Sequence, residues 1–146
     1  SGMFYNCYSL QAVPLLNTAT VTNMSGMFYN CYSLQTVPLF NTPAVTNMRY
    51  MFNNCYALQT VPLFNTAKVT DMSYMFNNCY ALSSIKMINI KESFSILNCS
   101  LDAAALNELY TNLSTVTGKT ITVTGNPGVT GDNPAIATAK GWTVTG

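Results

Sequence analysis

The sequence contains no histidine, the residue that proteins use most often as a general base and as a metal ligand. It also carries few charges: only 8% of the residues are Asp, Glu, Lys or Arg, and the net charge is +1. So small a charge gives no field that would attract nucleic acid or an anionic membrane surface. No apolar run approaches the roughly 18 residues that a membrane-spanning helix needs. We therefore expect no nucleic-acid partner and no membrane insertion.

The acidic residues are too scattered to form a catalytic pair. The five carboxylates are Asp71, Glu92, Asp102, Glu108 and Asp132. General acid–base chemistry needs such groups placed together around a substrate. The chain also lacks the Cys-x-x-Cys spacing that often marks a zinc site. We therefore expect no enzyme, no metal site and no cofactor.

What the chain has in abundance is repetition. One unit begins at Ser1, Ser25, Arg49 and Ser73, so the unit is 24 residues long. A Met-Phe pair occupies its third and fourth positions each time, and a cysteine occupies its seventh. A fixed period of this length indicates stacked coils that share one core. Because residues 1–7 match residues 25–31 one for one, the chain opens within a repeat and is expected to be a piece of a longer protein.

Each unit predicts one short extended segment. In the second unit Val37 and Leu39 alternate, so both are expected to face the core, with Leu34 entering it just before. Stacking would pair this segment with its copies as a parallel sheet, at a strand spacing of about 4.8 Å. A proline recurs inside each segment, at Pro14, Pro38 and Pro62. Because proline removes a ladder donor, the strands must be very short, with the prolines at their end or on their outer face.

The second half of the unit predicts about two helical turns. Val45, Met48 and Phe52 are spaced i, i+3, i+7, as on the inward stripe of a helix. The Asn-Cys pair that follows, as at Asn30-Cys31, is expected to turn the chain back.

Residues 89–146 diverge from the repeat. Leu106, Leu109 and Leu113 predict a helix over residues 101–113, with Ser100 as its N-cap. Alternating β-branched residues predict strands at 119–124 and 142–145, and a proline and a glycine bound a short helix at 133–141. Atypical terminal units are typical of a cap. We expect one domain, residues 1–146, with repeats over 1–88 and a diverged C-terminal cap over 89–146.

The repeat pattern carries a family resemblance. The spacing Cys-x-x-Leu-x-x-Val-x-Leu from Cys31, followed by Val-x-x-Met-x-x-Met-Phe from Val45, resembles the BspA-like leucine-rich repeats of bacterial and phage surface proteins. The resemblance covers residues 1–88 and implies an α/β repeat fold, a right-handed leucine-rich-repeat solenoid with a short-stranded parallel sheet. It also implies an extracellular adhesion or ligand-binding role, and it supplies no catalytic residue.

Two repeated columns are candidate ligand-binding surfaces. If Val37 and Leu39 face inward, the alternate residues face outward, and a stripe of apolar side chains marks an interaction site. The alternative is that position 40 lies past the strand and folds back into the core. The second column holds tyrosines, which suit recognition of sugars or protein but also seal a solenoid edge as half-buried rings. The candidate site residues are Thr36, Phe40, Thr60 and Phe64 on the strand, with Tyr32 and Tyr56 at its entry.

Two other columns favour structural roles. The in-register thiols Cys7, Cys31, Cys55 and Cys79 are expected to be reduced core residues, although their spacing is near the range of a disulfide. The asparagines that precede them are expected to hydrogen-bond turn backbone of their own and the next coil.

These patterns favour a non-catalytic binding or adhesion module on a cell or phage surface, recognising a protein or glycan ligand of a host or cell. Low charge with abundant Asn, Thr, Ser and Tyr agrees with an extracellular, cell-surface or virion-surface location. The alternative is a structural building block of a larger fibre or tail, which self-associates through its uncapped N-terminal rung.

Overall fold

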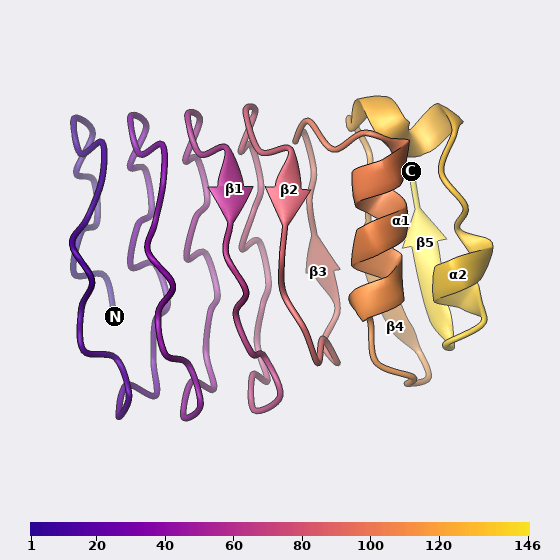
Figure 1. Ribbon diagram of the computed structural model, residues 1–146, viewed down its shortest axis with the longest axis horizontal. Coiled ribbons are helices and arrows are strands. Elements are labelled where there is room, and N and C mark those ends of the chain that lie inside the picture. Colours follow the sequence, from indigo (N-terminus) through magenta and orange to yellow (C-terminus); the bar gives the residue numbers. More distant parts are fainter.

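The 24-residue period folds into coils that lie side by side along the long axis of the molecule. The computed structural model describes residues 1–146, with the N-terminus at one end and the helices at the other (Figure 1). Backbone hydrogen bonds join equivalent or adjacent repeat positions of neighbouring coils: Phe28 N donates to Met51 O at 2.9 Å, and Gln35 N donates to Gln11 O at 2.9 Å. Each coil therefore satisfies backbone groups of the next, as the stacked arrangement predicts.

The predicted parallel pairing of the repeats is present, in very short strands. β1 (Thr60–Val61) and β2 (Ser84–Ile85) pair in parallel, with Thr60 opposite Ser84. β1 ends directly before Pro62, which has no N–H to continue the ladder. The equivalent segments of the first two coils are extended without a regular strand. Proline thus limits the ladder, as expected, but the strands are shorter still than the sequence indicates.

The alternation predicted around Val37 is wrong by one residue. Phe40 is buried, whereas Leu39 is 56% exposed, so the inward residues of this segment are Leu34, Val37 and Phe40. A spacing of three is that of a polyproline-type extended chain, which has three residues per turn, and not the spacing of two of a flat strand. Pro38 lies in the middle of the segment, and its restricted φ favours that conformation.

The helical turns predicted for the second half of each unit are absent. Asn47 forms parallel bridges with its copies in the coils on both sides, and residues 49–54 form tight turns. Tyr50 and Asn54 have φ values of 56° and 61°, and left-handed residues placed this closely interrupt a right-handed helix. Val45, Met48 and Phe52 are nevertheless fully buried. The predicted inward stripe is therefore confirmed, but its backbone is not helical.

The diverged region contains the regular elements that the sequence predicts. β3 (Phe94–Ser95), β4 (Lys119–Thr122) and β5 (Trp142–Thr145) form a parallel sheet in that order, behind α1 (Ala103–Asn112) and α2 (Ala135–Thr138) in Figure 1. A 3-10 turn, η1 (Pro127–Thr130), links β4 to α2. The N-cap of α1 is Asp102, whose carboxylate accepts from Ala105 N at 2.8 Å, and not Ser100 as predicted.

Polar side chains of this region tie its helices together. The hydroxyl of the buried Tyr110 on α1 donates to Asp132 at 2.6 Å. Lys140, just after α2, donates to the carbonyls of Tyr110 at 3.3 Å and Leu113 at 2.9 Å. Both carbonyls lie at the C-terminal end of α1, where Tyr110 O also accepts from the C-cap Leu113 N at 3.3 Å, so the ammonium group adds to the cap of the helix.

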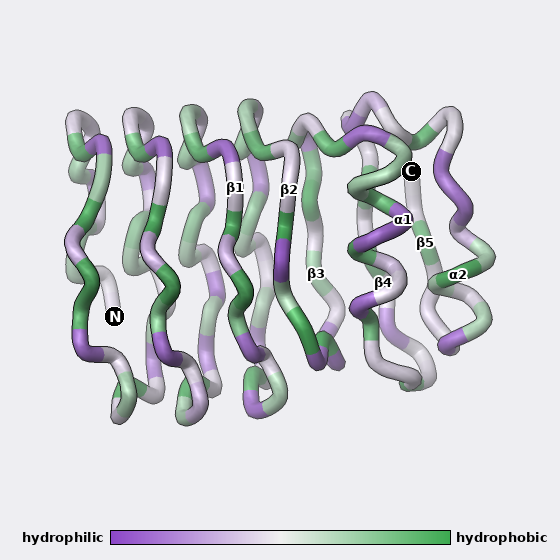
Figure 2. The backbone as a smooth tube through the Cα atoms, viewed as in Figure 1, coloured by the Kyte–Doolittle hydropathy of each residue, from purple (hydrophilic) through white to green (hydrophobic).

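One hydrophobic core runs the length of the molecule. Its 37 buried residues extend from Val13 in the first coil to Trp142 in β5. Figure 2 shows the cause, because hydrophobic positions recur at similar heights in successive coils. Phenylalanine rings stack through this core, with Phe28 and Phe52 at a centroid distance of 5.5 Å.

Candidate binding surfaces

The cysteine column is structural, and three of its four members are buried while Cys7 is half-buried. All five cysteines are free thiols, and Cys31, Cys55 and Cys79 each donate to the carbonyl of a phenylalanine in the preceding coil at 3.0 to 3.1 Å. Burial raises the pKa of Cys31 to about 11, and it raises the pKa values of Cys55 and Cys79 as well. Because the thiolate is the nucleophile and the metal ligand, these thiols are poor candidates for chemistry at neutral pH.

The asparagine column forms a ladder of side-chain amides. Asn30 donates to Asn6 at 2.9 Å, Asn54 to Asn30 at 2.8 Å, and Asn78 to Asn54 at 2.9 Å. The amides thus bond one another, and not the turn backbone as predicted. Each has a φ close to +60°, a conformation that asparagine tolerates better than most residues. No group of three or more His, Cys, Asp or Glu side chains is placed to hold a metal ion.

The predicted phenylalanine stripe does not exist on the surface. Phe40 and Phe64 are buried and stack on each other at 6.1 Å, so neither can contact a ligand. This correction follows from the three-residue spacing around Pro38, which turns the phenylalanines inward. The predicted site residues Thr36 and Thr60 are exposed.

An exposed leucine column takes the place of that stripe. Leu15, Leu39 and Leu63 are 71%, 56% and 53% exposed, and we call these three residues the leucine ridge. A hollow of about 400 Å³ lies against Leu15 and Leu39, and another of about 300 Å³ lies against Leu39 and Leu63. Exposed apolar side chains in register form a contiguous surface, which marks interaction sites. The sequence shows these leucines, but an assumed period of two places them inside.

The predicted tyrosine column is a stack of half-exposed rings. Tyr32 lies 4.9 Å from Tyr8 and 4.7 Å from Tyr56 between ring centroids, and Tyr56 lies 5.2 Å from Tyr80. The predicted site residue Tyr56 is 38% exposed, and Tyr32 is half-buried. Stacking covers the faces of the inner rings, so this column offers edges and hydroxyl groups to a ligand.

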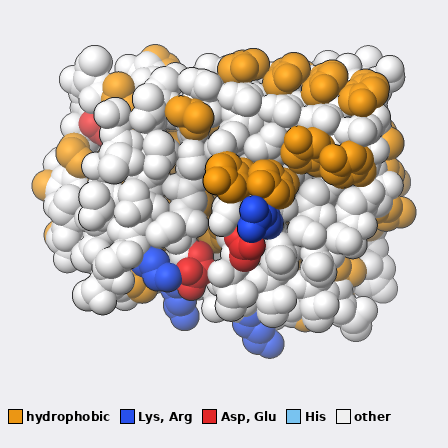
Figure 3. Space-filling model, turned by 180° about the vertical axis from the view of Figure 1, so that it is seen from behind, with side chains coloured by type: hydrophobic (Ala, Val, Ile, Leu, Met, Phe, Trp, Pro, Cys, Tyr) orange, Lys and Arg blue, Asp and Glu red, His pale blue; other side chains and the backbone are white.

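A second tyrosine column changes repeat position midway. Tyr5 and Tyr29 stack at 4.8 Å, Tyr29 meets Tyr50 edge-on at 6.0 Å, and Tyr50 stacks on Tyr74 at 5.1 Å. We call these four residues the stepped column. The guanidinium of Arg49 lies 4.8 Å from the Tyr50 ring centre. Figure 3 shows the face behind that of Figure 1, where hydrophobic side chains, tyrosine included, form rows along the long axis.

The sequence contains a sign of this change of repeat position. Where Asn53 and Asn77 replace the tyrosine at the fifth position of the unit, Tyr50 and Tyr74 replace the glycine at the second position. Taken alone, the change to asparagine indicates that the column stops. Only a comparison of both positions shows that the aromatic ring moves to the neighbouring position.

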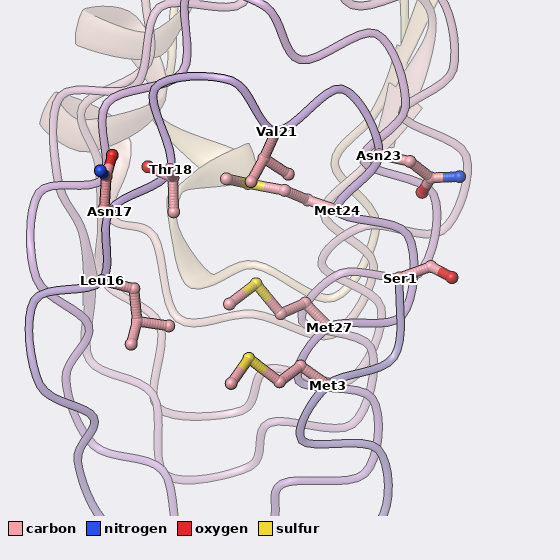
Figure 4. A pocket seen from close by; sticks show the side chains of 9 residues that line it. All are labelled: Ser1, Met3, Leu16, Asn17, Thr18, Val21, Asn23, Met24 and Met27. Carbon is pink, nitrogen blue, oxygen red and sulfur yellow. The ribbon is translucent and has the colours of Figure 1, made fainter.

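An apolar hollow of about 310 Å³ lies against the first coil. In Figure 4 the side chains of Met3, Leu16 and Met27 point into this space, whereas that of Asn23 points away. Met3 is 67% exposed, but its copies Met51 and Met75 are fully buried. The hollow is therefore lined by repeat positions that belong to the core in later coils, and its lining contains no titratable side chain.

Comparison with known proteins identifies a family but no function. The family described as "Mycoplasma protein of unknown function, DUF285" matches residues 1–113. The match covers the four repeats and extends through α1. No curated protein and no solved structure matches the chain. None of its helices has the length and apolar character needed to cross a membrane.

Proposed function

The chain belongs to the DUF285 family, and from its surface we propose that it is a non-catalytic binding or adhesion module of a cell or virion surface. The proposed architecture is a right-handed, BspA-like leucine-rich-repeat solenoid. Supporting this proposal are the in-register hydrogen bonds between coils and the short parallel strands. Stacked repeats of this kind present side chains in columns and suit ligands that extend along the stack.

The leucine ridge carries the proposal. Its three side chains are more than half exposed in a chain whose other apolar repeat positions are mostly buried. The hollows beside the leucines would accept side chains of a protein ligand, and the exposed Thr36 and Thr60 would donate hydrogen bonds near them. An apolar centre beside polar groups is the usual anatomy of a protein-binding surface.

The ridge is tested on arrays of host matrix proteins and glycans. The double variant Leu39→Gln, Leu63→Gln should lose binding to the protein spots that the unchanged chain binds, because the apolar contacts are removed. A Lys68→Gln variant, altered at an exposed turn residue, is the control and should bind as before. Unchanged binding by the double variant would exclude the ridge. Loss of binding only after Tyr32→Ala and Tyr56→Ala would place the site on the tyrosine column.

A structural building block is the second candidate, and the exposed apolar side chains of the first coil favour it. Met3 and the half-buried Phe4 and Val21 leave apolar surface around the hollow there. Contact between two such rungs would cover that surface. Light scattering should then show a mass that rises with concentration, and Met3→Glu should hold the chain as a monomer. A monomer at all concentrations would refute self-association.

A further inference from the structure

The stepped column leaves a hollow where its tyrosines change position. The hollow has a volume of about 490 Å³ and we call it the glycine hollow. Its floor contains Gly2 and Gly26, which occupy the position of Tyr50 and Tyr74 in the later units. Its lining residues are Ser1, Gly2, Tyr5, Ser25, Gly26, Tyr29, Asn47, Arg49 and Tyr50. Its size is within the usual range of small-ligand sites, about 300–1,000 Å³.

Backbone geometry does not require glycine on this floor. Gly26 has a φ of 59°, but Tyr50 adopts a φ of 56° at the same position of the next unit. A Cβ atom on Gly26 would lie 3.7 Å from the Tyr5 ring and 3.9 Å from Tyr29 Cβ, which are ordinary contact distances. The effect of the two glycines is therefore to keep the space empty.

One charged side chain and several unused donors line this space. Arg49 is the only charged side chain in the lining, and the other three units carry serine at its position. Arg49 Nη2 donates to the Tyr50 hydroxyl at 3.2 Å, and Asp71 approaches Nη1 only to 3.8 Å with both groups partly exposed. The guanidinium has five N–H donors, so several remain for a ligand. Asn47 accepts from Arg49 N at 2.9 Å through its oxygen, which leaves its amide nitrogen free to donate. The Ser25 hydroxyl also makes no hydrogen bond in the structure.

These groups define the chemistry of a ligand. A cation selects an anionic group, and guanidinium pairs well with a carboxylate. Hydroxyl and amide donors select a ligand with many oxygen acceptors, and the tyrosine side chains at the walls offer apolar contact with a polar tip. We propose that the glycine hollow binds an acidic saccharide, with its carboxylate on Arg49 and its ring over Gly26, against the side chain of Tyr29. This rests on the proposed function of a binding module, but the hollow shares no residue with the leucine ridge.

The test is titration with three acidic oligosaccharides, 3′-sialyllactose, a hyaluronan tetrasaccharide and trigalacturonate, followed by backbone amide NMR. At least one should bind with shifts centred on Gly2, Gly26 and Tyr50, about tenfold or more tightly than neutral lactose. Arg49→Ser installs the residue that the other units use, so the fold is kept while affinity should fall about tenfold. Arg49→Lys retains the charge and should lose less affinity than Arg49→Ser.

A second variant fills the hollow with the residues that the third unit carries at the same repeat positions. Gly26→Tyr combined with Tyr29→Asn gives the second unit the pair found as Tyr50 and Asn53 in the third. It should still fold, because Tyr50 adopts the same φ, with a melting temperature lowered by the strain of a left-handed tyrosine, and it should bind none of the saccharides. Leu39→Gln should leave saccharide binding unaltered.

The inference would be overturned by no binding of any acidic saccharide, by equal binding of lactose, or by unchanged affinity in Arg49→Ser. Equal binding of a poly-glutamate peptide would also overturn it, because the site would then recognise charge alone. The proposed function has a separate outcome. If saccharide binding fails but the leucine-ridge variants still lose their protein ligands on the array, the proposed function stands. If the ridge variants bind the array as the unchanged chain does, the proposed function fails, whether or not the saccharides bind.

Discussion

Neighbouring residues of one segment have opposite environments, and this gives the sharpest test at the residue scale. Phe64 is fully buried and its ring stacks against Phe40 and Phe52, whereas Leu63 is 53% exposed. Phe64→Ala should lower the free energy of unfolding by ~3–5 kcal/mol through lost burial and a cavity. Leu63→Ala should change it by less than ~1 kcal/mol. Urea denaturation of both variants measures this difference, and similar losses would mean that the segment is turned as a flat strand.

The buried thiols predict a dependence of stability on pH. Burial raises the pKa of Cys31 from 9.0 in an ordinary environment to about 11, so the folded state holds this proton more tightly than the unfolded chain. The resulting stabilisation is complete below pH 9 and is lost as the pH rises towards 11. Melting temperatures measured between pH 7 and 11 should therefore fall above pH 9. Cys31→Ala removes this contribution and should flatten part of the fall, and an identical pH profile would contradict the assignment.

At the scale of elements, the sequence predicted an element correctly or not according to where the backbone hydrogen bonds of that element are made. α1, β4 and β5 carry their own signals, a helical period or β-branched alternation, and the structure has them where predicted. The repeat turns combine local bonds, as when Met51 N donates to Met48 O at 3.1 Å, with bonds to neighbouring coils, as when Asn30 N donates to Asn53 O at 3.0 Å. The bonds between coils leave no periodicity in the sequence, so the spacing of Val45, Met48 and Phe52 predicted a helix that does not form.

The amide ladder stabilises these turns, and its central member can be tested. Asn54 donates to Asn30 and accepts from Asn78, and its φ is 61°. Asn54→Ala loses both hydrogen bonds and strains the left-handed backbone, which together should cost ~2–3 kcal/mol. Asn54→Gly relieves the strain but not the loss of the bonds, so it should cost ~1 kcal/mol less than alanine. Calorimetric unfolding separates the two contributions. Equal losses would show that the left-handed turn contributes nothing.

At the scale of the whole molecule, the period of the sequence predicted the stacking of the coils but not the composition of their surface. Every coil repeats its neighbours, so a register error of one residue in one unit is copied into all of them. That is why Phe40 and Phe64 were misplaced together, while Thr36, Thr60 and Tyr56 lie on the surface as expected. The stepped column was missed because its tyrosines occupy two different repeat positions.

The diverged region matters to the whole molecule because it covers the last repeat. Leu82, Met87 and Ile90 of the fourth unit are buried, and Ile90 bridges Leu113 just after α1. Removal of residues 101–146 would expose these side chains and the N–H and C=O groups of the last coil, an arrangement that pairs readily with other chains.

The truncated chain should therefore aggregate, seen as a higher scattering mass than the full chain has at the same concentration. Its remaining folded fraction should also melt at a lower temperature, because repeat stability depends on nearest-neighbour contacts. If the truncated chain kept both the scattering mass and the melting temperature of the full chain, the repeats would be stable alone and residues 101–146 would not be a cap.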